Sequence, residues 1–408
     1  RRGHQLVHHQ RVDADVDVVI WSEVIEHVPR VLDALMMVTS RLRTGGALFL
    51  TTPWGAHDAG HPPAKTDLGT PRDPRGHVRA MTARDVVTKI DLLGAGFAVE
   101  DLHKVSMFPA NLGDGLHALV TRRAEPTTCA ATPAVFVVPG ALWDWHGRRV
   151  WMQGMGASEK SIVQFGEALA REYRRVEVYG PVPDPDVCRG VRYWPREQLR
   201  HVTAGKIIVS RGPSYHAVLD KQLRDGAEKL PRLLWLQDAY YPDLTQENVA
   251  RYEQIVCVSE WHKQAMHELH DVPLSKMTVI YNPITPALYQ VVLVERKPDH
   301  FIYASSPDRG LVRLLELWPK IRQVLPTATL DIYYGWRGCE KLGLGSDAAW
   351  TQRYETARRA FETLRYQPGV AVHDMVAPDI LARAYKRAGI WFYPTHYHET
   401  CCTNALEA

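Results

Sequence analysis

The chain has 408 residues, a length that at about 150 residues per domain predicts two or three domains and excludes a single small module. Its 49 Lys and Arg residues against 46 Asp and Glu leave a formal net charge of +3, and 45% hydrophobic with 23% charged residues is typical of a globular protein. Disorder, collagen and coiled coil are thereby excluded. Because the positive charges form no clustered stripe, we expect no nucleic-acid partner.

Six cysteines are scattered along the chain without the paired spacing of a disulfide framework or a zinc ribbon. We therefore expect a reducing compartment, the cytoplasm. The longest apolar runs, such as residues 18–21 and 134–138, are far shorter than the roughly 20 residues of a membrane span. The chain begins at Arg1 rather than Met and stops at Ala408 inside a predicted helix, so we interpret it as a fragment.

The first part of the chain alternates strand and helix patterns. Continuous β-branched or apolar runs predict strands, and spacing of 3.6 residues predicts helices. The predicted elements are strand 16–21, helix 28–42, strand 47–51, helix 82–93 and strands 97–105 and 116–121. This order predicts a mostly parallel sheet that ends in a hairpin, in a first domain over residues 1–123. The small, polar and proline-bearing stretch 124–133 is predicted to be a linker.

The remainder repeats the alternation with short buried strands, which predicts α/β domains of Rossmann type. Strands are predicted at residues 135–138, 176–179, 207–210, 233–236, 255–259 and 278–281, and then at 301–304, 329–334, 370–373 and 390–393. Helices separate most of them, notably 311–324 and 379–387. A proline-bearing break over residues 282–298 divides the two series, so we predict domains at 134–290 and 291–408 with a cleft between them.

Residues 17–28 (DVVIWSEVIEHV), followed by 44–53 (TGGALFLTTP) and by 77–79 (HVR), resemble the second half of class I S-adenosylmethionine-dependent methyltransferases. The resemblance implies S-adenosylmethionine as the cofactor of the intact domain, with Trp21, Ser22 and Glu23 at its crevice, and it makes residues 16–20 an edge strand. The glycine-rich turn of the family is missing, so we expect this fragment not to bind the cofactor. A solvated charge cluster at a helix start is the alternative for Glu23.

The end of the chain places Glu399 and Glu407 eight positions apart after a buried strand, an E-x7-E arrangement. On a helix, eight positions span at most about 12 Å and bring both side chains within a quadrant of each other, so the pair is suited to gripping two ends of one ligand. The amides of residues 400–403 would then open a helix N-terminus, which favours a diphosphate. The alternative is a surface helix that the two carboxylates merely cap and solvate.

Residues 134–408 resemble retaining glycosyltransferases of the GT-B fold, family 4. The resemblance rests on the E-x7-E segment and on pieces in the expected order, namely GMGASE at 154–159, VIYN at 279–282, YASSPDRG at 303–310 and YYG at 333–335. It implies a nucleotide-diphosphate sugar donor, no metal, and a glycan or glycolipid acceptor. In that reading Glu399 contacts the hydroxyls of the donor sugar, Glu407 contacts the ribose, and Arg309 binds the diphosphate.

Further site residues are predicted on both sides of the cleft. Many members of the family have a histidine after the strand 233–236, whereas this chain has Gln237 and Asp238, and Asp238 is the catalytic candidate together with Glu399. The acceptor side is predicted to include Gly156 and Glu159, and for Glu159 and the adjacent Lys160 first-turn helix charge is the alternative. Further donor contacts are predicted at Gly310, Thr400, Cys401, Cys402 and Thr403. The chain departs from the family at Asn282-Pro283, where Asn-Gly is usual, and in offering only Arg309 and Gly310 in the phosphate loop.

Other patterns in the chain are weaker. The segment with His396, His398, Cys401 and Cys402 does not have zinc-ligand spacing, and Asp184-Pro-Asp186 is predicted to be a turn. The expected activity is therefore retaining glycosyl transfer in polysaccharide or glycolipid assembly, which leaves open a peripheral contact with the inner membrane face. The alternatives are a sugar-binding scaffold without turnover, and methyl transfer as the principal activity of the parent protein.

Overall fold

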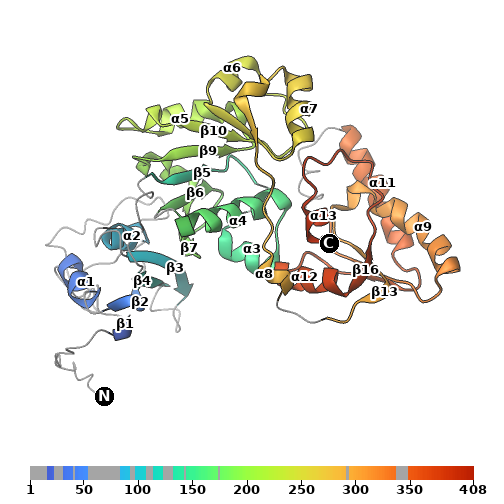
Figure 1. The fold of residues 1–408 in the computed structure, drawn as a ribbon, viewed down its shortest axis with the longest axis horizontal. Helices are drawn as coiled ribbons and strands as arrows, with labels where there is room; N and C mark the ends of the chain where they lie inside the picture. Colours follow the sequence, from blue (N-terminus) through green and yellow to red (C-terminus); the bar gives the residue numbers. More distant parts are fainter. Residues whose placement is uncertain are drawn as a thin grey trace. The chain divides into compact units, whose positions relative to one another are not determined.

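The computed structural model of the chain describes residues 16–22, 31–39, 42–53, 83–91, 97–106, 114–122, 132–141, 144–172, 175–290, 294–336 and 348–408. These residues form two compact units. Unit 1 takes the described residues within 1–131, 172–174 and 184–192, and unit 2 takes those within 132–171, 175–183 and 193–408. Figure 1 colours the first strands of unit 1 blue, whereas the later elements of unit 2 run through yellow to red.

Unit 1 is built on a mixed sheet with the strand order β1-β2-β4-β3-β7. Its elements are β1 (Val16–Ser22), α1 (Val31–Thr39), β2 (Leu42–Pro53), α2 (Ala83–Asp91), β3 (Phe97–Ser106), β4 (Asp114–Arg122) and β7 (Asp186–Cys188). The predicted strands and the final hairpin are present. The predicted helix 28–42 is wrong at its end, because Leu42 already belongs to β2, and its residues 28–30 lie outside the described residues. The prediction of a mostly parallel sheet is wrong for the described strands, because β1 and β2 are parallel whereas β4 lies antiparallel between β2 and β3.

Strand β1 stands at one end of this order, which confirms the predicted edge strand among the strands described. Its side chains Val18 and Ile20 are 61% and 72% exposed. The interior of the unit instead lies on the middle strands, where Leu48, Val99 and Val120 are buried. Among the described strands β1 therefore pairs on one side only, and it carries exposed apolar side chains.

Unit 2 contains two sheets, and the larger has the order β8-β6-β5-β9-β10-β11-β12. Its strands are β5 (Ala134–Val137), β6 (Val176–Gly180), β8 (Val191–Pro195), β9 (Lys206–Ser210), β10 (Arg232–Trp235), β11 (Gln254–Cys257) and β12 (Met277–Val279). The helices in this part of the chain are α3 (Gly147–Gln153), α4 (Ala157–Glu172), α5 (His216–Gln222), α6 (Gln246–Ala250), α7 (Glu260–His270) and α8 (Ala287–Gln290), of which α8 packs through Tyr289 against a core cluster of the smaller sheet. The strands from β6 to β12 in this order pair in parallel, so their carboxyl ends meet at one edge.

The smaller sheet has the parallel order β15-β14-β13-β16. Its elements are β13 (Lys297–Tyr303), α9 (Leu311–Val324), β14 (Thr329–Ile332), α11 (Ala348–Leu364), β15 (Val370–Val372), α12 (Pro378–Arg387), β16 (Ala388–Trp391) and α13 (Thr403–Glu407). Figure 1 shows α9 and α11 in orange beside this sheet.

Helices cover both faces of the smaller sheet, as the alternation along β13 shows. Phe301 packs in one core cluster with Trp318 of α9 and Phe361 of α11. Ile302, the next residue, packs with Tyr385 of α12 in another cluster. Because neighbouring side chains of a strand point to opposite faces, the two clusters lie on opposite sides of the sheet. The fold is therefore α/β, as predicted. None of the helices in the described part of the chain combines the length and the apolar character that a membrane span requires.

Gly310 supports a testable prediction about stability. Its φ is 113°, and a Cβ atom there would lie 2.5 Å from the carbonyl oxygen of Pro394. Gly226 has a similar φ of 90° but open space around it. Gly310→Ala is therefore expected to lower the free energy of unfolding by about 1–3 kcal/mol more than Gly226→Ala, because only the first adds overpacking to the backbone cost. Urea unfolding of both variants measures the difference, and equal losses would contradict the close packing at Gly310.

Candidate functional site

A cleft with a cavity volume of about 460 Å³ lies in unit 2 and is lined by residues from both of its sheets. The lining follows the carboxyl ends of the strands. It includes Arg211 after β9, Asp238 after β10, Ser305 after β13 and Tyr334 after β14. Segments that follow parallel strands meet at the same edge of a sheet, which is why residues far apart in sequence gather here.

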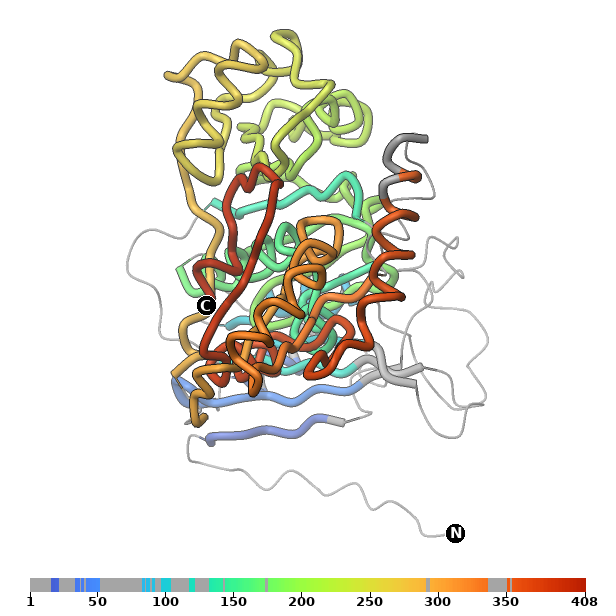
Figure 2. Tube along the Cα trace, turned by 90° about the vertical axis from the view of Figure 1, so that its right-hand side faces the viewer, coloured from blue at the N-terminus to red at the C-terminus, as the bar shows by residue number. Residues whose placement is uncertain are grey.

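The segment between β16 and α13 runs as a long loop that extends toward α7 and returns to the end of the chain, as the red trace in Figure 2 shows. The hydroxyl of Thr400 donates to the carbonyl of Gln237 (2.7 Å), and Ser259 donates to the carbonyl of Thr400 (2.6 Å). The rings of His398 and Trp261 stack with centroids 6.0 Å apart. These contacts fasten the loop to the larger sheet.

The predicted helix from Glu399 to Glu407 is wrong in its first half. Helix α13 begins at Thr403, so Glu399 lies in the preceding loop and the two carboxylates do not share a helix. The physical reason is that Thr400 makes its hydrogen bonds to Gln237 and Ser259, on the other sheet, instead of within a helix. Both glutamates nevertheless line the same cleft.

Glu399 is held by two donors. Nη1 of Arg309 and the hydroxyl of Tyr393 both donate to its Oε1, at 3.1 and 2.5 Å, and the Arg309 guanidinium lies 4.0 Å from the centre of the Tyr397 ring. Burial works to lower the pKa of Arg309, but the acidic groups around it, Glu399 first and then Tyr397, Tyr393 and Asp308, together raise it above the ordinary value. Burial and the hydrogen bond to Glu399 raise the pKa of Tyr393 to about 12. The phosphate-binding cation predicted here is therefore paired with the predicted sugar-binding carboxylate.

Glu407 forms a buried ion pair with Lys160 of α4. The Nζ of Lys160 lies 2.5 Å from Oε1 of Glu407, and the two side chains are only 11% and 4% exposed. The phenol of Tyr289 also faces this carboxylate. Burial raises the pKa of Tyr289, and the negative charge of Glu407 raises it further. The predicted ribose-binding carboxylate is thus joined to a lysine of the larger sheet's first long helix.

Arg211 lies between two acidic residues on the other side of the cleft. Its Nε donates to Asp238 at 2.8 Å, and its Nη1 lies 3.6 Å from Glu159. Burial works to lower the pKa of Arg211, but these two carboxylates raise it above the ordinary value. A Cβ on Gly156 would lie 2.8 Å from Oε2 of Glu159, so the residue at 156 must be small for Glu159 to occupy this position. Glu159, Arg211 and Asp238 form one connected group.

The backbone at Asp238 is held in place by hydrogen bonds to Tyr241 and His262. The hydroxyl of Tyr241 accepts from the amides of Gln237 and Asp238 at 2.7 and 2.8 Å. Nδ1 of the buried His262 accepts from the amide of Val258, so its proton is on Nε2, which donates to the carbonyl of Asp238 at 3.0 Å. Burial lowers the pKa of His262 to about 4, and the bond to Asp238 offsets part of this shift. His262 is therefore neutral at pH 7.

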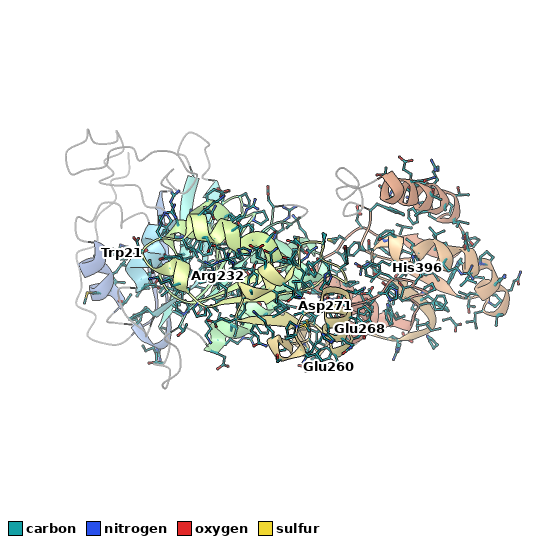
Figure 3. All side chains as sticks on the ribbon, turned by 90° about the horizontal axis from the view of Figure 1, so that it is seen from above. Trp21, Arg232, Glu260, Glu268, Asp271 and His396 are labelled. Carbon is teal, nitrogen blue, oxygen red and sulfur yellow. The ribbon has the colours of Figure 1, made fainter. Side chains whose placement is uncertain are left out.

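The structure places most of the predicted site residues in the cleft. The described residues of the prediction that line it are Gly156, Glu159, Asp238, Arg309, Glu399, Cys401, Cys402, Thr403 and Glu407. Gly310 packs against Pro394 outside the lining, and Thr400 uses its side chain on Gln237. Trp21, visible in Figure 3, and Ser22 end β1 in unit 1, whereas Glu23 lies outside the described residues.

The sequence reasoning missed Arg211 and His262, and it considered Lys160 only together with Glu159, as an acceptor-side residue or a first-turn helix charge. A signal for Arg211 was available, because Arg211 follows a predicted strand at its carboxyl end. His262 offered no local signal. The histidines near the end of the chain have other positions. His396 is exposed on the loop (Figure 3) and His398 stacks on Trp261. Within the described ranges no three His, Cys, Asp or Glu side chains are placed to hold a metal ion.

His262 predicts a pH dependence of stability. Its pKa falls from the unfolded value of about 6.5 to about 4 on folding, so the unfolded chain binds the extra proton between these values and stability is lost as the pH falls. From pH 7 to pH 5 this residue is expected to cost about 2 kcal/mol. His262→Gln, whose amide offers one acceptor and one donor, should be less stable at pH 7 but should lose about 2 kcal/mol less over that interval. Urea unfolding at pH 7 and pH 5 measures the loss. If the free energy of unfolding fell by the same amount in variant and parent, a neutral, buried His262 with a lowered pKa would be contradicted.

No protein-family model and no curated protein matches the sequence. Solved structures resemble the chain at low identity. Sucrose-phosphate synthase from Thermosynechococcus elongatus has a TM-score of 0.48 and 15% identity, over 68% of this chain and 78% of that chain. A UDP-forming α,α-trehalose-phosphate synthase from Burkholderia xenovorans has a TM-score of 0.42 and 8% identity, over 65% and 78%. The lipopolysaccharide outer core galactosyltransferase WaaB has a TM-score of 0.41 and 12% identity, over 68% and 78%. Similarities of this size carry no functional argument, so function has to be inferred from the cleft.

Proposed function

We propose that the chain is a retaining glycosyltransferase, which moves a sugar from a nucleotide-diphosphate sugar to a glycan or glycolipid acceptor. The observation that carries the proposal is the meeting of Glu399, Glu407 and Arg309 in one cleft of unit 2. The sequence motif and its resemblance predict these three residues as the donor site. Carboxylates accept hydrogen bonds from sugar hydroxyls, and a guanidinium pairs with phosphate oxygens.

The donor is proposed to lie along the side of the cleft formed by the smaller sheet and the last loop. Arg309 would bind the diphosphate, Glu399 the hydroxyls of the sugar, and Glu407 the ribose. When the bond between sugar and diphosphate breaks, negative charge grows on the leaving diphosphate. Cations already fixed in the cleft stabilise this charge without further reorganisation, and such electrostatic stabilisation often contributes most to the rate of a group transfer.

The acceptor is proposed to enter from the side of the larger sheet, where Glu159 and Asp238 line the cleft. Asp238 is 41% exposed at its side chain, so an incoming hydroxyl can reach it beside its bond to Arg211. We keep Asp238 as the candidate catalytic carboxylate on this side. The tie between the Asp238 carbonyl and His262 holds its backbone in place.

The methyltransferase origin of unit 1 stays a prediction, because neither the unit's sheet nor the comparisons test it. S-adenosylmethionine binding is not proposed for this chain. A sugar-binding protein without turnover would use the same cleft as the proposed enzyme, and the two differ in one outcome. An enzyme releases nucleoside diphosphate when donor and acceptor are present, whereas a scaffold only binds the donor.

A panel of nucleotide sugars, screened by thermal shift and then for release of nucleoside diphosphate, tests the proposal. A donor that binds only the folded chain must raise the unfolding midpoint. We expect at least one nucleotide sugar to do so and to be turned over, slowly by hydrolysis or faster with an acceptor glycan. Binding without any release would favour the scaffold, and the absence of binding across the panel would contradict both.

The two glutamates should differ in their kinetic roles. Glu399→Gln is expected to lower kcat, because the carboxylate lies near the bond that breaks, whereas Glu407→Gln should mainly raise the donor KM through uniform binding of the ribose. Losing a charge-assisted hydrogen bond costs about 1.5–3 kcal/mol, or roughly ten- to hundredfold in the affected constant. Initial rates against donor concentration separate the two effects. Kinetics like those of the parent for both variants would show that neither glutamate belongs to the site.

A further inference from the structure

The cleft of unit 2 has an unfavourable charge for the proposed donor. Its lining contains the cations Lys160, Arg211 and Arg309 against four carboxylates, a formal charge of −1 when all are ionised. A nucleotide-diphosphate sugar brings two further negative charges. Arg211 is shared by Asp238 and Glu159 and lies on the proposed acceptor side. Arg309 alone cannot compensate a diphosphate, and the loop 305–310 around it holds no second basic residue.

Lys160 is placed to supply the second positive charge. Its ammonium group lines the same cleft and touches Glu407, the carboxylate proposed to bind the ribose. In a nucleotide the ribose diol and the first phosphate are separated by one sugar ring. Lys160, paired with the carboxylate proposed to bind the ribose, is therefore separated from the first phosphate by the width of one sugar ring. A lysine side chain, with its flexible four-carbon chain, can move its ammonium group over that distance.

The two ion pairs of the donor side follow the same pattern. In each, one motif glutamate is paired with one cation, Glu399 with Arg309 and Glu407 with Lys160. When sugar and ribose hydroxyls take over the carboxylates, both cations lose part of their pairing at the moment that the diphosphate arrives. Phosphate oxygens are then the available partners, and unpaired buried charges are costly.

We propose that Lys160 is a phosphate-binding residue of the donor site, delivered from α4 beside the larger sheet, and that its bond to Glu407 is the resting pair that donor binding exchanges. This inference rests on the proposed function and deepens it by naming the second cation for the diphosphate. If Lys160 served only to join α4 to α13, its replacement would lower the stability of the protein but would change the affinities for a nucleoside and for its diphosphate by the same factor.

The test compares uridine, adenosine, guanosine and thymidine with their 5′-diphosphates by calorimetric titration. The readout is the factor by which a diphosphate binds more tightly than its nucleoside. Lys160→Met is expected to reduce this factor roughly ten- to hundredfold, the loss of one charge-assisted hydrogen bond, whereas Lys160→Arg should largely retain it. Glu407→Gln should weaken the nucleoside and its diphosphate equally and leave the factor unchanged.

Two further variants guard against misfolding and general charge effects. Lys160→Met leaves the buried Glu407 carboxylate without its cation, which can destabilise the fold. The double variant Lys160→Met with Glu407→Gln removes both charges, so it should fold and should still show the reduced preference for diphosphate over nucleoside. Lys386→Met is the matched control. This lysine donates to the carbonyl of Tyr289 from outside the cleft lining, and its loss should leave the factor unchanged.

The outcomes separate the two proposals. A parent protein that binds none of the nucleosides or diphosphates overturns the proposed function, and the role of Lys160 with it. A parent protein that prefers a diphosphate, together with a Lys160→Met variant and a double variant that prefer it equally, overturns the role of Lys160 alone. An equal loss of the factor in Lys386→Met would also overturn it, because the effect would then come from general charge.

Discussion

The pairing of charges in the cleft of unit 2 is the constraint on which the site depends. Among the described lining residues each cation touches a carboxylate: Lys160 pairs with Glu407, Arg309 with Glu399, and Arg211 with Asp238. The partners are distant in sequence, by 247, 90 and 27 residues. Because a buried charge without a partner is costly, the buried pair of Lys160 and Glu407 holds α13 against α4, while the more exposed pairs of Arg309 and Arg211 link the last loop to residue 309 and the end of β9 to the end of β10.

Much of the fold of unit 2 could be predicted from local sequence. Residues 135–138 and 207–209 are continuous apolar runs, which are typical of buried strands in a parallel sheet, and the predicted strands 135–138 and 207–210 lie within one residue of β5 and β9. The short strands β7 and β8 were missed. Asp186–Cys188 follows a proline-rich bend, and Val191–Pro195 carries an arginine and a proline, so neither segment has the pattern of a buried strand.

The site was less predictable because its decisive contacts are not local. The spacing of Glu399 and Glu407 predicted a helix, yet the bonds from Thr400 to the larger sheet, more than 100 residues away in sequence, prevent its first half from forming. The family resemblance named both glutamates and Arg309. The resemblance did not predict which side chains these glutamates contact in the structure. Lys160 reaches Glu407 only through the packing of α4, and Tyr393 reaches Glu399 only through the turn after β16.

The buried amides of Gln237 and Asn282 show a further consequence of the fold. Each donates to the other's carbonyl oxygen, at 3.1 and 3.0 Å, beneath the loop that carries Asp238. An asparagine side chain ages by attack of the following backbone nitrogen, which converts the amide to a carboxylate. The residue after Asn282 is Pro283, which has no backbone N–H for this reaction. An Asn-Gly sequence at this place would be the most prone to this reaction, whereas Pro283 prevents it. The protection matters for the Gln237–Asn282 pair, because a carboxylate at position 282 would have no proton to donate to the carbonyl oxygen of Gln237.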